Sequence, residues 1–135
     1  MNPQLRRPFS SEQLKSEYGL EGIRLLPWTG LNVPFGGAYC IVPPGSSSLE
    51  HVNSPADEEE LFVCVAGEAS VVVGEQRFPA RRGDVFFMPR GVSHYVANDG
   101  DEPFHFYALW WNKETAAEFL RRRQAESHAV GDYSI

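Results

Sequence analysis

From residue 37 to residue 111 the sequence alternates short apolar runs with residues that form turns. Gly, Pro, Asn and Asp separate these runs, which lie at residues 38–42, 60–65, 69–73, 76–79, 85–88, 94–97 and 104–111. Runs of this length at regular spacing are typical of antiparallel strands in a sandwich or barrel. No internal repeat of about 20–50 residues is visible, which argues against a solenoid or a propeller. The pattern therefore predicts one small all-β barrel over residues 37–111.

Residues 1–36 show no regular apolar pattern, and we interpret them as an N-terminal arm. Ser10 or Ser11 is a suitable cap for a short helix that runs through Glu17, because Ser-Ser-Glu-Gln precedes Leu14. Pro and Gly residues then interrupt any longer element. An arm that lies across a partner subunit is one option, which the sequence does not require.

The segment after the last apolar run has helical spacing. Asn112 is a suitable N-cap, and Ala116, Phe119 and Leu120 follow at intervals that place them on one side of a helix. We therefore expect a short C-terminal helix over residues 112–126 that packs on the barrel. Residues 127–135 are polar and are expected to form a flexible tail.

Composition narrows the function classes. The chain has 135 residues, which fits one domain, and its formal net charge of −6 argues against nucleic-acid binding. No signal peptide is recognisable, and no window reaches the about 20 apolar residues that a membrane span needs. Cys40 and Cys64 lie in apolar runs and are expected to be buried thiols, with a disulfide between them as the alternative. We expect a cytoplasmic protein whose partner is a small molecule.

Two histidines and a carboxylate provide the main candidate site. His51, Glu60 and His94 lie in or next to three different strands. Alternate side chains of a strand face a barrel interior, so these three could converge on one pocket. Two imidazoles and one carboxylate suit a divalent transition metal and leave positions open for substrate, water or dioxygen. The alternative is that the histidines are ordinary barrel-lining residues without a metal.

The spacing of these residues resembles two signature motifs of the cupin superfamily. The second motif has all of its defining positions: Gly83, Pro89, Gly91, His94 and Asn98. The two ends of the first motif are matched by Gly45, His51, Glu60 and Gly67. The resemblance covers residues 38–111 and implies a small single-domain cupin, a double-stranded β-helix or jelly-roll barrel.

The resemblance also implies a metal at the centre of the barrel. In the family pattern two histidines and a glutamate of the first motif, and one histidine of the second, bind the metal. His51, Glu60 and His94 keep three of these positions, but Asn53 stands where the other histidine is expected. Glu58 shares strand parity with Glu60 and could take the carboxylate role. We prefer Glu60, because its spacing from Gly67 in the sequence matches that of the first motif.

Other side chains are candidates for contacts with a substrate. His105 and Tyr107 share one face of residues 104–111, and they could orient a substrate or move a proton if that face meets the cavity. Packing is the alternative for this face. We expect Arg90 at the mouth of the cavity, where it could attract a carboxylate, and we add a further pair of candidate substrate contacts, Tyr39 and Phe62.

Three functions follow from these expectations. The first is a mononuclear Fe(II) enzyme of the dioxygenase type that acts on a small organic molecule. The second is a redox-neutral Zn(II) cupin, namely an isomerase, a cyclase or an enzyme that forms nitrogen–nitrogen bonds, and in the last case the chain could come from a larger multidomain protein. The third is a cupin that binds a small molecule without turnover. The resemblance also implies a homodimer, which light scattering at micromolar concentration would test.

Overall fold

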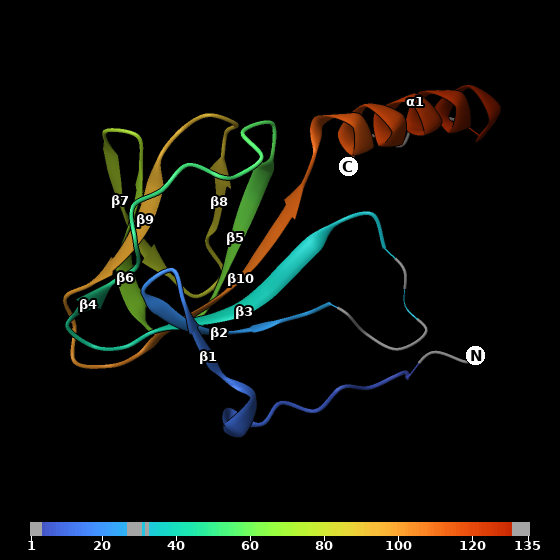
Figure 1. Cartoon of the computed structure of the whole chain (residues 1–135). Coiled ribbons are helices and arrows are strands. Elements are labelled where there is room, and N and C mark those ends of the chain that lie inside the picture. The colour runs from blue at the N-terminus through green and yellow to red at the C-terminus, as the bar shows by residue number, and fades with distance from the viewer. Residues whose placement is uncertain (1–3, 27–30, 32, 131–135) are drawn as a thin grey trace.

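The computed structural model describes residues 4–26, 31 and 33–130. Within these residues ten antiparallel strands form two sheets (Figure 1). The six-stranded sheet contains, in spatial order, β1 (Lys15–Glu17), β2 (Leu20–Arg24), β3 (Gly36–Val42), β10 (Phe104–Trp111), β5 (Glu59–Ala66) and β8 (Val85–Met88). The four-stranded sheet contains β4 (Ser46–Ser47), β9 (His94–Asn98), β6 (Glu68–Val73) and β7 (Gln76–Arg81). The expected all-β architecture with one C-terminal helix is confirmed.

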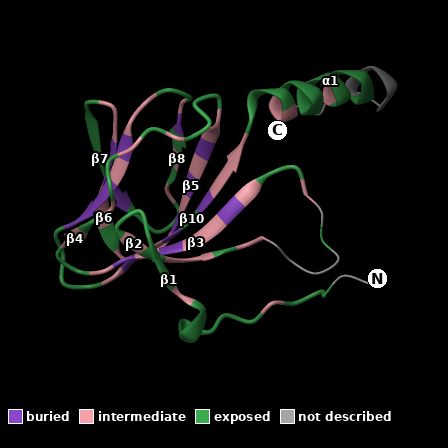
Figure 2. Ribbon diagram, in the orientation of Figure 1, coloured by how far each residue is buried: buried purple, intermediate pink, exposed green. Residues whose placement is uncertain are grey.

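The core lies between the two sheets, and strand alternation decides which side chains enter it. On β5, Glu60, Phe62 and Cys64 are buried while their neighbours are only partly covered (Figure 2). On β10 the inward set consists of Phe104, Phe106 and Ala108. Because side chains of a strand alternate between faces, each strand gives one face to the core and one to the surface. Both cysteines are buried and free, without a disulfide.

Residues 15–17 and 20–24, which we expected in the N-terminal arm, form two strands of the six-stranded sheet. The expected helix through Glu17 is wrong: one 3-10 turn at Ser11–Gln13 is followed directly by β1. Tyr18 and Gly19 join β1 to β2 with φ angles of 53° and 75°. Two consecutive residues with positive φ make a tight hairpin turn, which continues the twist of its strands. The hairpin then extends the six-stranded sheet, because β2 pairs with β3.

The C-terminal helix α1 (Lys113–Val130) is longer than expected and does not pack as expected. The Oδ1 of Asn112 accepts a hydrogen bond from the Thr115 backbone N–H at 2.8 Å, so the predicted cap is present. The helix leads away from the barrel in Figure 1, and Phe119 and Leu120 are 59% and 58% exposed. The prediction that these residues pack on the barrel is therefore wrong. The helix also includes residues 127–130, which we expected in the tail, and residues 131–135 lie outside the described part.

A membrane span is not found among the described helices. No helix in this part of the chain combines the length and the apolar character that crossing a bilayer needs.

Candidate functional site

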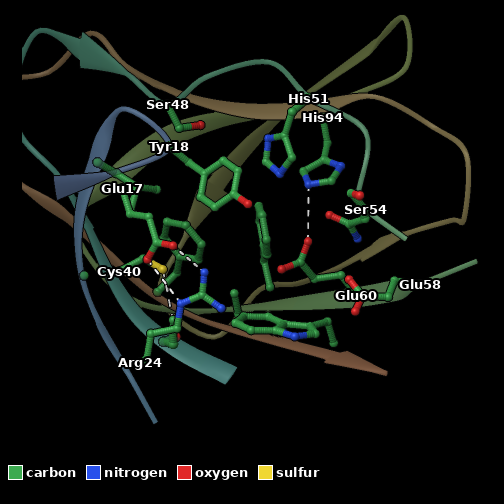
Figure 3. Close-up of a pocket in the computed structure, with 18 of the residues that line it drawn as sticks. Glu17, Tyr18, Arg24, Cys40, Ser48, His51, Ser54, Glu58, Glu60 and His94 are labelled. Atoms are coloured by element: carbon green, nitrogen blue, oxygen red, sulfur yellow. Dashed lines mark hydrogen bonds and ion pairs between the residues drawn. The ribbon is translucent and has the colours of Figure 1, made fainter. Parts of the chain in front are cut away.

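A cavity of about 400 Å³ opens between the two sheets. Its wall combines side chains from both sheets with side chains from the β1–β2 hairpin (Figure 3). The polar lining residues are Glu17, Tyr18, Arg24, Ser48, His51, Asn53, Ser54, Glu58, Glu60 and His94. A volume of this size fits a small molecule, because ligand pockets hold about 300–1,000 Å³.

His51 and His94 are brought together by their backbones. The backbone N–H of His51 donates to the carbonyl of His94 at 3.2 Å, and the N–H of His94 donates to the carbonyl of His51 at 3.0 Å. Residues that exchange both backbone bonds in an antiparallel pair lie directly opposite each other, with their side chains on one face. The two imidazole rings accordingly lie 4.7 Å apart between centroids. Residues 43 positions apart in the sequence thus share one wall of the cavity.

The backbone also orients both imidazoles. The Nδ1 of His51 lies 3.0 Å from the Leu49 carbonyl, and the Nδ1 of His94 lies 3.3 Å from the Val92 carbonyl. A carbonyl only accepts, so these contacts assign the proton to Nδ1 of each neutral ring and leave Nε2 with a free lone pair. Metal-binding histidines are commonly held in this way through their second nitrogen. The pair is therefore set up to offer two Nε2 atoms.

Glu60 reaches His94 from the opposite sheet. Its side chain is 9% exposed and that of His94 is 2% exposed, and the Glu60 Oε1 lies 3.2 Å from the His94 Nε2. Even so, no hydrogen bond is formed to the buried Nε2 of His94 within the described part of the chain. A buried polar atom without a partner is costly and uncommon in a folded protein. This nitrogen and the carboxylate beside it mark the centre of the site.

The donor set suits a divalent metal. Imidazole nitrogens and a carboxylate oxygen are ligands that zinc and iron accept, and a cation would supply the missing partner of the His94 Nε2. Within residues 4–26, 31 and 33–130, no three His, Cys, Asp or Glu side chains are already gathered closely enough to hold one ion. His51, His94 and Glu60 are the residues whose donor atoms would fit such a metal chemically.

Asn53 and Glu58 also line the cavity, as their sequence positions suggested. Burial is the main cause that raises the pKa of the Glu58 carboxyl, and the neighbouring charges of Glu60 and Asp57 add to it. Glu60, rather than Glu58, makes the contact with His94. The two glutamates therefore line the same cavity, with Glu60 alone in contact with His94.

Phe62 lies in the cavity, but three other candidates do not. The Phe62 ring meets the His94 ring edge-on, with centroids 5.7 Å apart. Tyr39, His105 and Tyr107 do not line the cavity, so the structure agrees with the packing alternative for His105 and Tyr107 and does not place Tyr39 as a substrate contact. These three lie on the other face of their strands, where the Tyr39 hydroxyl hydrogen-bonds the His105 Nδ1 and the Tyr39 ring packs 5.1 Å from that of Tyr107. Strand parity separates them from the inward-facing Phe106 and Ala108.

Arg90 is likewise outside the cavity. Its guanidinium lies 3.4 Å from the Glu59 carboxylate, and Arg90 is absent from the cavity lining. Glu59 precedes Glu60 on β5 and therefore points to the other face of the sheet. Arg90 lies beside Glu59 on that face, and its expected place at the mouth of the cavity is thereby corrected.

The hairpin residues Glu17, Tyr18 and Arg24 line the cavity, and the sequence pattern did not reveal them. The Tyr18 ring stacks on that of His51, with centroids 4.7 Å apart and an angle of 23° between the planes. A hydrogen bond from Arg24 is the main cause that lowers the pKa of the Glu17 carboxyl. The sequence signal that could have revealed these residues is the pair Tyr18-Gly19. It lies between two short segments and suits the turn of a two-residue hairpin.

Cys40 lies in the cavity wall but is not set up as a nucleophile. Burial is the largest cause that raises the pKa of its thiol, to about 12. Since the thiolate is the reactive form, a protonated thiol at neutral pH has little reactivity. Cys64 is buried further along β5 and packs in the core.

Comparison with known proteins finds similar solved structures and similar curated protein sequences. The plu4264 protein of Photorhabdus luminescens is 42% identical, covers 88% of this chain and 97% of its own, and superimposes with a TM-score of 0.78. A Cupin 2 conserved barrel domain protein of Salinispora arenicola is 37% identical, covers 90% and 99% respectively, and has a TM-score of 0.76. A glucose-6-phosphate isomerase of Pyrococcus abyssi is 34% identical over 84 residues, which are 54% of this chain and 44% of that protein. The chain spans about half the length of the curated relatives it matches.

The family follows from a match over the barrel itself. The Cupin_2 family, described as a cupin domain, matches residues 38–111, which run from β3 to the end of β10. This range contains His51, Glu60 and His94. It covers more than half of the 135 residues, and the chain therefore belongs to the Cupin_2 domain family.

Proposed function

We propose that this protein is a metal-dependent isomerase that acts on a small hydroxylated carbonyl compound, with a divalent cation held by His51, His94 and Glu60. The observation that carries the proposal is the buried His94 Nε2, which has no hydrogen-bond partner among the residues that the structure describes and faces the Glu60 carboxylate at 3.2 Å in the cavity. The relative named glucose-6-phosphate isomerase favours redox-neutral chemistry over the dioxygenase hypothesis. A sugar phosphate is the substrate class that this relative suggests.

The residues of the chain have separable roles in such a reaction. When bound, a divalent cation polarises a carbonyl and makes the adjacent C–H more acidic. Glu58 lines the cavity without contacting the His94–Glu60 pair, which makes it the candidate to take the proton from one carbon and return it to the next. Phe62 and Phe106 cover the inner wall and exclude water. A second proton passes from the hydroxyl oxygen to the former carbonyl oxygen, so one carbon is oxidised, its neighbour is reduced and the reaction is redox-neutral overall.

Metal content is the direct test of the proposed site. We expect about one Zn(II) or Fe(II) ion per chain in the wild type and background amounts in His94→Ala and Glu60→Gln, because each loses a donor of a three-residue set. Mass spectrometry of untagged protein measures this. His105→Ala is the matched control, since this histidine lies outside the cavity and should leave the metal content unchanged. Equal metal content in all four proteins would contradict the proposal.

Two activity assays separate the proposed reaction from the other two functions. Interconversion of glucose 6-phosphate and fructose 6-phosphate, followed by NMR, is expected from the wild type and lost in His94→Ala. Oxygen uptake with a metal-loaded protein would instead favour the dioxygenase function. Saturable binding of the sugar phosphate without turnover or oxygen uptake would favour the non-catalytic function.

Restoring the missing histidine should strengthen metal binding. Asn53 lines the cavity two residues after His51, and imidazole is a better ligand for zinc or iron than an amide. We expect Asn53→His to tighten metal binding by about tenfold or more, measured by competition with a chelator. In a His94→Ala background, Asn53→His should tighten metal binding much less, because the two ligands act on one ion. An equal gain in both backgrounds would place the new imidazole in a separate site.

A further inference from the structure

Arg24 places a positive charge at one end of the cavity. It is the last residue of β2 and, among the described residues, the one Arg or Lys that lines the cavity. The other charged lining residues are the three carboxylates Glu17, Glu58 and Glu60. A negatively charged ligand group therefore has one favourable end in the cavity, apart from the site proposed for the metal.

The guanidinium of Arg24 lies over an aromatic ring. Its central carbon lies 5.3 Å from the centre of the Trp110 ring, and Trp110 also lines the cavity. Trp110 is paired with Glu60 across β10 and β5, so the same part of the sheet supports both ends of the cavity. Stacking fixes the plane of a guanidinium and leaves its N–H edge free to make paired bonds to an oxyanion.

At present that edge is occupied by Glu17. The Nε of Arg24 donates to the Glu17 Oε2 at 3.1 Å, and its Nη2 donates to the Oε1. Both side chains are about half exposed, at 49% and 45%. An ion pair that is open to water contributes little stability, so a ligand anion can replace its carboxylate at small cost. Glu17 thus occupies the position that a substrate oxyanion would take.

The opposite end of the cavity has different chemistry. Figure 3 shows Arg24 and Glu17 on one side, His94 and Glu60 on the other, and the Tyr18 ring between them. At their end the carboxylates of Glu58 and Glu60 would offset the charge of a bound divalent cation, whereas Arg24 favours an anion at the other end. A small molecule with one terminal anion would consequently be bound in a single direction.

We propose that Arg24 binds the terminal anionic group of the substrate, a phosphate or a carboxylate, in exchange for Glu17, and that this contact directs the other end of the molecule toward His94 and Glu60. The identity of the reaction rests on the function proposed above, but the anion site does not. Arg24 is thereby a specificity-determining residue outside the matched family range of 38–111.

An NMR titration tests the anion site independently of catalysis. Inorganic phosphate and acetate are the two anionic probes and glucose is the uncharged one, and the reporters are the Arg24 Nε–H and Trp110 Nε1–H resonances. We expect phosphate or acetate, but not glucose, to shift both resonances in the wild type and in His94→Ala, where the proposed metal site is removed. The anion that binds more tightly identifies the phosphate or carboxylate class.

Two substitutions should act in opposite directions. Arg24→Gln should weaken anion binding by about tenfold, since the paired charge-assisted bonds are lost, with the Trp110 resonance as the reporter. Glu17→Gln should tighten it by about threefold, because the competing carboxylate is removed. The matched control is Arg77→Gln, whose guanidinium is 50% exposed and lies 3.6 Å from Asp99, away from the cavity. It should bind the probe like the wild type.

The outcomes separate this proposal from the proposed function. Unchanged anion binding in both Arg24→Gln and Glu17→Gln would overturn the anion site, whatever the metal content. If the protein contains no metal but Arg24→Gln and Glu17→Gln change anion binding as expected, the metal site would be overturned and the anion site would stand. If isomerase activity is found, Arg24→Gln should raise KM for the sugar phosphate by about tenfold with little change in kcat, because the contact lies far from the reacting carbon.

Discussion

Replacing Phe106 by alanine should lower the free energy of unfolding by about 3–5 kcal/mol, as large truncations in a packed core do. Phe106 is 1% exposed on β10, and its ring centroid lies 4.6 Å from that of Phe62 and 5.7 Å from that of Phe104. The lost ring would leave a void between the sheets that the neighbouring aromatic side chains fill only in part. Urea denaturation followed by circular dichroism measures the change.

The control for this substitution is the next residue along the strand. Tyr107→Ala removes a ring of similar size from the outer face of β10, where Tyr107 is 40% exposed. We expect a loss of about 1 kcal/mol, mostly from its ring contact with Tyr39. Equal losses for Phe106→Ala and Tyr107→Ala would contradict the placement of the core on one face of this strand.

Replacing Gly67 by alanine should destabilise the protein by about 3 kcal/mol, for two reasons that add. Gly67 joins β5 to β6 with a φ of +83°, a conformation that side chains disfavour. A Cβ at this position would also lie 2.3 Å from the backbone carbonyl oxygen of Pro103. Since that oxygen belongs to the backbone just before β10, the strand itself would have to move.

Gly83→Ala separates these two causes. Gly83 has a φ of +94°, and a Cβ there would meet no atom within 4 Å. Only the backbone conformation opposes this substitution, so we expect a loss of about 1 kcal/mol. Denaturation curves of the two variants, measured side by side, give the steric part as their difference. A loss at Gly83 as large as that at Gly67 would show that the contact with Pro103 contributes nothing.

The motif residues that revealed the family divide into two groups in the structure. His51, Glu60 and His94 face the cavity, while Gly67 makes the tight approach to Pro103. Asn98 also has a structural role, because its side-chain amide donates to the carbonyls of Val42 and Glu102, and its Oδ1 accepts from the Gly100 N–H. The motif resemblance implied a role for the first group alone, and the tertiary structure shows what Gly67 and Asn98 do.

The N-terminal contribution to the cavity could not be predicted from local pattern. The β1 and β2 strands are three and five residues long, and none of their residues is fully buried. Without a buried face, such strands carry no alternation to detect. The β2 strand pairs with the distant β3, and β1 pairs with β2, so both join the sheet through a contact between distant segments. Glu17, Tyr18 and Arg24 enter the cavity wall only through that pairing.

The sequence by itself determined the barrel, the inward set of β5, and the histidines and glutamate that share the cavity. Each of these depends on local alternation or on motif spacing, which the chain carries whatever its surroundings. Only the tertiary structure decided which face of residues 104–111 meets the core, where Arg90 points, and that Arg24 rather than Arg90 lines the cavity. The physical reason is that strand alternation divides the side chains into two equivalent sets, one on each face, and does not say which set is buried. Where both faces of a strand are apolar or aromatic, as in Phe104–Trp111, only packing against the second sheet selects the buried one.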